Sequence, residues 1–125
     1  MAKTVMVVDD SGSFRTVVKL ALQKAGYEVV EAADGKDACG KLDGRKLNLI
    51  VCDVNMPQMD GIEATRRIKQ VLPATIIIGL SVQNAAHVGR VMKEAGAAAF
   101  LNKEAAVEDL YQTIQVARKE LLQVP

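Results

Sequence analysis

Residues 4–30 read TVMVVDDSGSFRTVVKLALQKAGYEVV, and this stretch decides the fold. It begins with the apolar, β-branched run Thr4–Val8, which predicts a buried strand. Apolar residues then recur at helical spacing and predict a helix packed on the core; they are Phe14, Val17, Val18, Ala21, Leu22 and Ala25. Gly26 stands where this helix is expected to stop, because glycine reaches the left-handed conformation at little cost. Tyr27–Val30 then predicts a second strand, which completes a strand–helix–strand unit.

The same alternation continues along the chain. Further strands are predicted at Leu47–Cys52, Thr75–Leu80 and Ala99–Leu101. Helical stripes lie between and after them: Ile62, Thr65, Ile68 and Leu72, then Val88, Val91, Met92 and Ala95, and finally Val107, Leu110, Ile114, Ala117 and Leu121. The helix expected over residues 35–42 is weaker, because Gly40 costs it about 1 kcal/mol relative to alanine. Gly96 repeats the glycine stop seen at Gly26.

Strict alternation of strands and helices predicts an α/β fold. The strands should be parallel and joined by right-handed crossovers, with helices on both faces of a five-stranded sheet. The continuous apolar run Ile76-Ile77-Ile78 suits a strand that is buried on both faces. No linker or change of composition divides the chain, so we expect a single domain over residues 1–125.

Composition and charge argue against several classes of function. Half of the 125 residues are apolar, but no apolar run is long enough to span a bilayer. The net charge is only +1, which offers no general attraction for nucleic acid. Residues 1–4 lack the order of a secretory signal, so we expect a cytoplasmic protein that contacts neither membrane nor nucleic acid. Cys39 and Cys52 form neither a CxxC pair nor a zinc spacing.

The main functional signal comes from the residues at the ends of the predicted strands. Asp9 and Asp10 follow the first strand, Asp53 the third, Ser81 the fourth and Lys103 the fifth. In an open α/β sheet, ligands bind outside the carboxyl ends of the strands, where the strand order reverses. Three carboxylates, a hydroxyl and an ammonium are therefore expected to meet at one edge of the sheet.

Each of these residues also has an ordinary structural interpretation. Asp10 or Ser11 would cap the first helix, and Ser81 would cap the fourth. Asp53 would open the turn that follows its strand, and Lys103 would be a solvated loop lysine. Taken singly, these interpretations are the better ones, but the convergence of all five side chains at one edge favours a site.

The charges in this set require a cation. Two like charges about 4 Å apart repel by roughly 4 kcal/mol at an effective dielectric near 20. Lys103 offsets only one of the three carboxylates, and a divalent ion would offset the rest. Oxygen ligands from a few carboxylates, with room for water and phosphate oxygens, favour Mg²⁺ over zinc or calcium.

Together these residues resemble the receiver domain of bacterial response regulators. The resemblance rests on Asp9-Asp10, on Val51-Cys52-Asp53-Val54-Asn55-Met56-Pro57-Gln58-Met59-Asp60-Gly61, on Ser81 and on Lys103, in this order. It spans essentially the whole chain. It implies a flavodoxin-like (βα)5 fold with strand order 2-1-3-4-5 and a role in two-component signalling.

The resemblance assigns roles to the acidic residues. It implies that Asp53 takes a phosphoryl group from the phosphohistidine of a sensor histidine kinase. Asp10, Asp53 and the main-chain carbonyl of Asn55 would hold Mg²⁺, and Asp9 would help through water. The chain would then be a phosphoacceptor that assists its own phosphorylation and dephosphorylation, and not a conventional enzyme.

The resemblance also implies a switch. Lys103 and Ser81 would each contact a phosphoryl oxygen, and the added charge would draw Ser81 inward. Phe100 stands at the position of the family's switching aromatic and would turn into the vacated space. The alternative for Phe100 is an ordinary core side chain near a strand end.

Two other functions fit the same fold class. A flavodoxin-like electron carrier would use the hydroxyls and amides of residues 11–16 near a helix start. Adjacent aspartates would repel its flavin phosphate, however, and two Tyr, two Phe and no Trp leave little for stacking. A phosphohydrolase similar to the haloacid dehalogenases would also use Asp53 as nucleophile, but it needs an acid where this chain has Asn55.

The chain departs from the usual receiver pattern in two respects. Glu104 follows Lys103, where many receivers have a proline, so a cis X-Pro bond is not expected there. Residues after Gly61 resemble receivers of LuxR-type transcription regulators, whereas the first sixty resemble a chemotaxis receiver. Two hypotheses of origin follow: a recombinant or designed join near Gly61, or an uncommon natural lineage.

The output surface is inferred from the family alone. Segments around Val88–Met92 and Leu110–Ile114, in the predicted fourth and fifth helices, would dock a downstream protein or effector domain. The chain is expected to be a monomer or weak dimer. It would act as a stand-alone protein or as the receiver of a longer chain.

Overall fold

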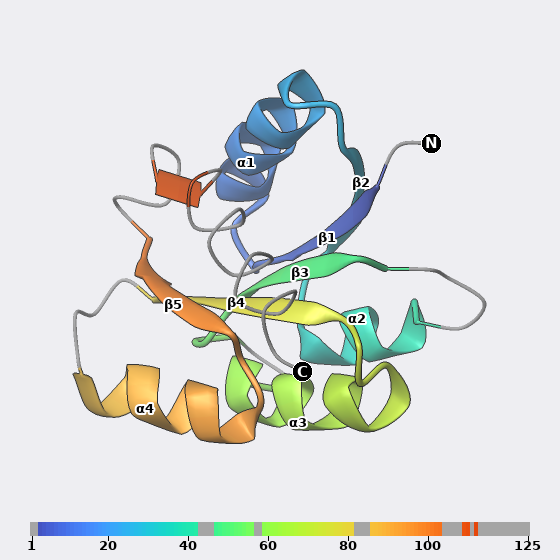
Figure 1. Ribbon diagram of the computed structural model, residues 1–125. Coiled ribbons are helices and arrows are strands. Elements are labelled where there is room, and N and C mark those ends of the chain that lie inside the picture. Colours follow the sequence, from blue (N-terminus) through green and yellow to red (C-terminus); the bar gives the residue numbers. More distant parts are fainter. Residues whose placement is uncertain are drawn as a thin grey trace.

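The computed structural model describes residues 3–42, 47–56, 59–81, 86–103, 109, 110 and 112. Within these residues, strands and helices alternate as the sequence predicts (Figure 1). The strands are β1 (Thr4–Val8), β2 (Glu28–Ala32), β3 (Leu49–Asp53), β4 (Ile76–Ser81) and β5 (Ala99–Asn102). The helices are α1 (Gly12–Lys24), α2 (Gly35–Gly40), α3 (Gly61–Val71) and α4 (Ala86–Ala95). None of the described helices is long and apolar enough to cross a bilayer.

The five strands form one parallel sheet in the order β2-β1-β3-β4-β5, which confirms the predicted order. The chain moves outward from β1 to β2, then crosses back over β1 to β3 and continues in the other direction. The strand order therefore reverses between β1 and β3. Ligands of open α/β sheets bind beside such a point, outside the carboxyl ends of the strands.

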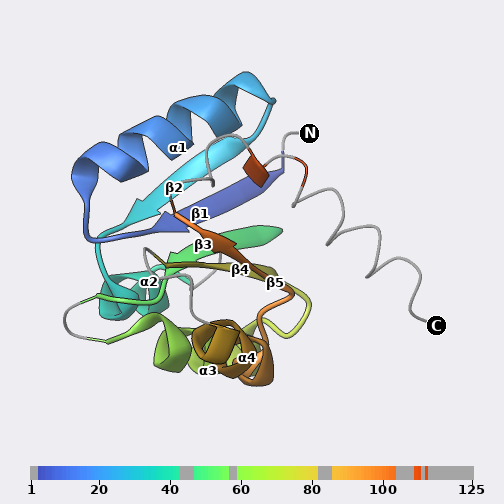
Figure 2. The ribbon, with the colours of Figure 1, turned by 90° about the vertical axis from the view of Figure 1, so that its left-hand side faces the viewer.

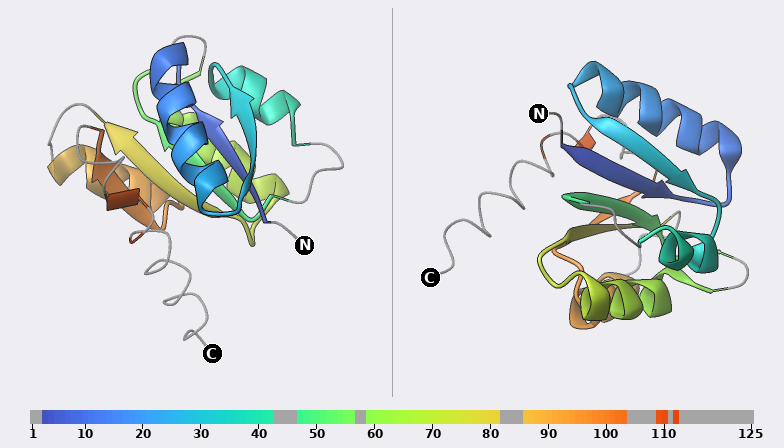
Figure 3. Two further views of the ribbon diagram at one scale, coloured as in Figure 1. Left: turned by 90° about the horizontal axis from the view of Figure 1, so that it is seen from above. Right: turned by 90° about the vertical axis from the view of Figure 1, so that its right-hand side faces the viewer.

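Helices cover both faces of the sheet and close two apolar cores. Figure 2 shows α1 on one face and α2, α3 and α4 on the other, and Figure 3 shows the same layers from two further directions. On the α1 face, Val18 and Leu22 pack against strand residues such as Val7. On the opposite face, helix residues such as Ile68 and Met92 pack against the other side of the strands. Every residue of β4 is buried, as expected for the run at residues 76–78.

The two predicted glycine stops are confirmed. Gly26 and Gly96 both have positive φ angles, of 96° and 122°. After Gly26, the N–H of Tyr27 donates to the carbonyl of Leu22 at 3.0 Å, a hydrogen bond typical of the Schellman motif at helix C-termini. This bond explains why β2 begins at Glu28 and not at Tyr27, as the sequence pattern predicted.

Other predicted boundaries also shift by one or two residues. β3 begins at Leu49, two residues later than expected, and ends on Asp53. β4 begins at Ile76, because Thr75 belongs to the preceding turn: its N–H donates to the Leu72 carbonyl at 3.1 Å and its hydroxyl to the Leu47 carbonyl at 2.9 Å. The strand ends thus lie close to the residues predicted to form the site.

Two members of the predicted α1 stripe do not face the core. Val17 is 47% exposed and Ala25 is also exposed, whereas Val18 and Leu22 are buried. Consecutive residues on a helix point about 100° away from each other, so only the residues on one side of a broad apolar stripe contact the sheet. α2 is short and ends at Gly40, in line with its weak pattern. Most of the predicted last helix, including Val107, Ile114, Ala117 and Leu121, lies outside the described residues, but Leu110 is buried on the α1 face.

Candidate functional site

The end of β1 carries the first two carboxylates. Asp9 is fully buried, and its Oδ1 accepts a hydrogen bond from the N–H of Ser11 at 2.8 Å. Ser11 is the N-cap of α1, since its hydroxyl accepts from the N–H of Phe14 at 3.3 Å. The two capping alternatives are thereby separated: Ser11 caps the helix, and the exposed Asp10 is not used as the cap.

Asp53, the last residue of β3, is also buried, with only 4% of its surface exposed. Its Oδ1 accepts a hydrogen bond from the N–H of Asn55 at 3.3 Å, so Asp53 also opens the turn. The N–H of Gly61, the first residue of α3, donates to the Val54 carbonyl at 2.9 Å. The turn interpretation of Asp53 is confirmed, and its role as a site residue stays a prediction.

Lys103 connects the acidic residues to the far strands. Its Nζ lies 2.7 Å from Asp9 Oδ2 and 3.5 Å from Asp53 Oδ2, and its side chain is 14% exposed. Its main-chain N–H donates to the Ser81 carbonyl at 2.7 Å, which ties the end of β5 to the end of β4. Ser81 is buried at the last position of β4, so it is a strand residue at the same edge. Lys103 is not the solvated loop lysine of the alternative interpretation.

Burial and charge perturb both members of this ion pair. Burial, together with the neighbouring Asp9 charge, raises the pKa of Asp53 above its usual range, although Lys103 and the Asn55 N–H oppose the shift. Burial alone would lower the pKa of Lys103, but its contacts with Asp9 and Asp53 outweigh that effect and raise it. Lys103 therefore stays charged, while the ionised form of Asp53 is less favoured than in an exposed aspartate.

The three carboxylates are placed to hold a metal ion. Asp9, Asp10 and Asp53 each offer one oxygen, and these oxygens all lie within 4.8 Å of one another. Asp9 Oδ2 is buried and makes no hydrogen bond of good angle within the described part of the chain, so its contact with Lys103 is chiefly an ion pair. A buried oxygen short of hydrogen bonds suits a metal-bound water, and an all-oxygen donor set fits Mg²⁺.

The other two predicted site residues are Asn55 and Phe100. For Asn55 the structure shows the hydrogen bond from its N–H to Asp53, and the role of its carbonyl toward Mg²⁺ stays a prediction. Phe100 packs over the glycines of β4 and α4, Gly79 and Gly89. Its ring is partly buried against the apolar core, and its role as a switch stays a prediction.

Sequence reasoning missed two side chains of α1 that touch the site. Arg15 donates to the main-chain carbonyl of Asp9 at 2.6 Å and pairs with Glu31 of β2 at 3.3 Å. The ring of Phe14 lies under the Lys103 ammonium, with 4.5 Å between Nζ and the ring centroid. The sequence indicates Phe14 and Arg15 only by their place in the first turn of the helix that follows the two aspartates.

Comparison with known proteins identifies the family. The model of the response regulator receiver domain matches residues 5–115. This chain belongs to the response regulator receiver family. A receiver accepts a phosphoryl group in two-component signalling, so the chain is a phosphoacceptor of this kind.

Individual relatives include both small receivers and larger regulators. The chain is 38% identical over 105 residues to the chemotaxis protein CheY of Thermotoga maritima, a match that covers 82% of this chain and 87% of that protein. It is 41% identical over 70 residues to the alkaline phosphatase synthesis transcriptional regulatory protein PhoP of Bacillus subtilis, but this match covers 56% of the chain and only 29% of PhoP. The solved structure of Vibrio cholerae CheY4 is 35% identical, with a TM-score of 0.87 over 94% of this chain and 99% of that one. This receiver thus spans most of a CheY and less than a third of PhoP.

Proposed function

We propose that Asp53 is the phosphoacceptor of this receiver, with a sensor histidine kinase as donor. The observation that carries the proposal is the Lys103 ammonium, which lies between the buried Asp53 and Asp9 carboxylates at the sheet edge. A carboxylate oxygen of Asp53 would form a bond to phosphorus as the P–N bond of a phosphohistidine breaks, and the imidazole nitrogen would keep the electrons of that bond. Phosphoryl transfer depends mostly on positioning and on offsetting charge on the equatorial oxygens, and Lys103 provides one positive charge for this purpose.

Asp10, Asp53 and the Asn55 carbonyl would hold Mg²⁺, with Asp9 acting through a bound water. When bound, the ion would offset the remaining negative charge of the carboxylates and of the incoming phosphoryl group. The exposed Asp10 and the carboxylate oxygens within 4.8 Å of one another support this assignment. The Ser81 hydroxyl would contact a second phosphoryl oxygen, since Ser81 and Lys103 are joined through their main chains. Water attack on phosphorus would later return the Asp53 carboxylate.

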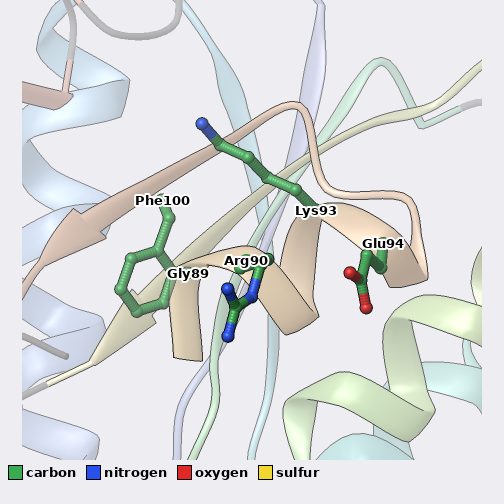
Figure 4. A pocket seen from close by; sticks show the side chains of 5 residues that line it. All are labelled: Gly89, Arg90, Lys93, Glu94 and Phe100. Atoms are coloured by element: carbon green, nitrogen blue, oxygen red, sulfur yellow. The ribbon is translucent and has the colours of Figure 1, made fainter. Parts of the chain in front are cut away.

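The response would be read at the face formed by α4 and β5. A surface pocket of about 580 Å³ is lined there by Gly89, Arg90, Lys93, Glu94 and Phe100. Figure 4 shows the Phe100 ring next to Gly89, with the charged side chains of Arg90, Lys93 and Glu94 further along α4. A turn of Phe100 after phosphorylation would change the shape of this pocket and so the docking of a downstream protein or effector domain. We propose that the chain works as a single receiver domain in the cytoplasm, as a monomer or weak dimer.

The test is incubation with a small phosphodonor such as acetyl phosphate, with Mg²⁺ or with chelator, read by intact mass. We expect one phosphoryl adduct in the parent with Mg²⁺, little adduct in chelator, and none in Asp53→Asn. Asp37→Asn on α2 is the matched control and should keep the adduct, because Asp37 lies outside the carboxylate cluster. An adduct that persists in Asp53→Asn would refute the assignment of Asp53, and a parent without any adduct would refute the function.

A further inference from the structure

The start of α1 contacts both members of the ion pair between Asp9 and Lys103. The N-cap residue Ser11 donates its N–H to Asp9 Oδ1 at 2.8 Å. Three residues later, the Phe14 ring lies 4.5 Å from the ammonium of Lys103, which pairs with the other oxygen of Asp9 at 2.7 Å. One turn of helix thus holds the anion through a backbone donor and the cation through an aromatic face.

The ring of Phe14 offers Lys103 an attraction that leaves its N–H groups available. An ammonium within about 6 Å of a ring centroid is drawn to the negative face of the ring, more strongly where water is excluded. Lys103 is only 14% exposed, so the contact is largely shielded from water. A carboxylate or hydroxyl in place of the ring would instead accept a hydrogen bond from the ammonium and compete with a phosphoryl oxygen.

Phe14 packs against the apolar core of the α1 face and also reaches the site. The buried residues of α1 are Val18 and Leu22, whereas Phe14 is only partly buried at the site end of the helix. The ring therefore lies at the edge of this core, where the Lys103 ammonium faces it. The side chain that touches it there belongs to the proposed site.

We propose that Phe14 is a positioning residue for phosphoryl transfer: its ring face holds the Lys103 ammonium against Asp9 and Asp53. This inference rests on the proposed function of Asp53. It predicts that the phosphorylation rate follows the electron density of the ring and not merely its size. Loss of the ring face in Phe14→Leu should slow phosphorylation roughly two- to thirtyfold.

The decisive experiment replaces Phe14 site-specifically with mono-, di- and trifluorophenylalanine, which keep the ring shape but weaken its negative face step by step. Phosphorylation by acetyl phosphate with Mg²⁺ is followed for each protein, with Val17→Ala as the control, because Val17 lies exposed on the same helix. We expect the rate to fall with each added fluorine and to stay unchanged in Val17→Ala. Equal rates across the fluorinated series would overturn the role of Phe14.

A second measurement is independent of phosphorylation. The ring current of Phe14 should shift the NMR signals of the Lys103 side-chain CH₂ next to Nζ upfield, and Phe14→Leu should abolish the shift. If the signals are the same in the parent and in Phe14→Leu, the contact is absent and the inference fails. If the shift is present but the parent takes no phosphoryl group, the contact between Phe14 and Lys103 is supported and the proposed function of Asp53 is refuted.

Discussion

Replacing Asp53 with asparagine is expected to stabilise the metal-free protein at neutral pH. The clustered oxygens of Asp9 and Asp53 lie within 4.8 Å of each other, so their charges repel by at least about 3.5 kcal/mol at an effective dielectric of 20. Lys103 Nζ lies 3.5 Å from Asp53 Oδ2, and its attraction stabilises the Asp53 carboxylate by about 4.7 kcal/mol at the same dielectric. The two effects nearly cancel, and the burial of the Asp53 carboxylate then decides the sign. We expect Asp53→Asn to raise the free energy of unfolding by on the order of 1–2 kcal/mol.

The effect has a defined pH dependence. The folded pKa of Asp53 is raised above its ordinary value of 3.8, first by burial and then by the Asp9 charge. Below that ordinary value the carboxyl is protonated in both the folded and the unfolded chain. Its ionisation then no longer makes the free energy of unfolding of the parent differ from that of the variant. As the pH rises through the raised pKa, the folded parent gives up a proton that it bound more tightly than the unfolded chain did, and its stability falls. The advantage of Asp53→Asn should therefore be full above the raised pKa and shrink toward about pH 4.

The assay is urea unfolding followed by far-ultraviolet circular dichroism in chelator, at neutral pH and near pH 4. Glu28→Gln is the control, because Glu28 is exposed on the edge strand β2 and should leave stability nearly unchanged. Added Mg²⁺ should stabilise the parent in proportion to ln(1 + [Mg²⁺]/Kd) and stabilise Asp53→Asn much less. A variant less stable than the parent at neutral pH, or an advantage that grows on acidification, would refute the electrostatic reasoning.

Two further predictions concern glycines beside the site. Gly61→Ala should lower the free energy of unfolding by about 1–3 kcal/mol in urea melts. The new methyl would overlap the Asp53 carbonyl oxygen and lie 2.8 Å from Val54 Cα. Unchanged stability would contradict this close approach. Gly89→Ala should alter stability by less than about 1 kcal/mol, since the gain in helix propensity offsets a methyl placed 3.2 Å from the Phe100 ring. The same change should displace that ring, so the ¹⁹F signal of 4-fluorophenylalanine at position 100 should move, and a fixed signal would show that α4 does not confine Phe100.

Sequence periodicity was a reliable guide to the fold where the controlling physics is local. The strand positions, the helix stops at Gly26 and Gly96, and the weak α2 all follow from patterns within a few residues. The carboxylates could be assigned to one site because the carboxyl ends of parallel strands share an edge. The hypotheses about the origin of the two halves of the chain, the bound Mg²⁺ and the docking partner stay predictions.

The sequence alone determined which residues are candidates for the chemistry of this receiver, because each follows or ends a strand recognisable from its own residues: Asp9, Asp10, Asp53, Ser81 and Lys103. Only the tertiary structure decided how they are paired: Lys103 lies closer to Asp9 than to Asp53, and the ring of Phe14 lies under it. The reason is physical. Strand and helix patterns depend on neighbours in sequence, whereas the pairing of a charge depends on which side chains of distant segments the packing of α1 and β5 brings within a few ångströms.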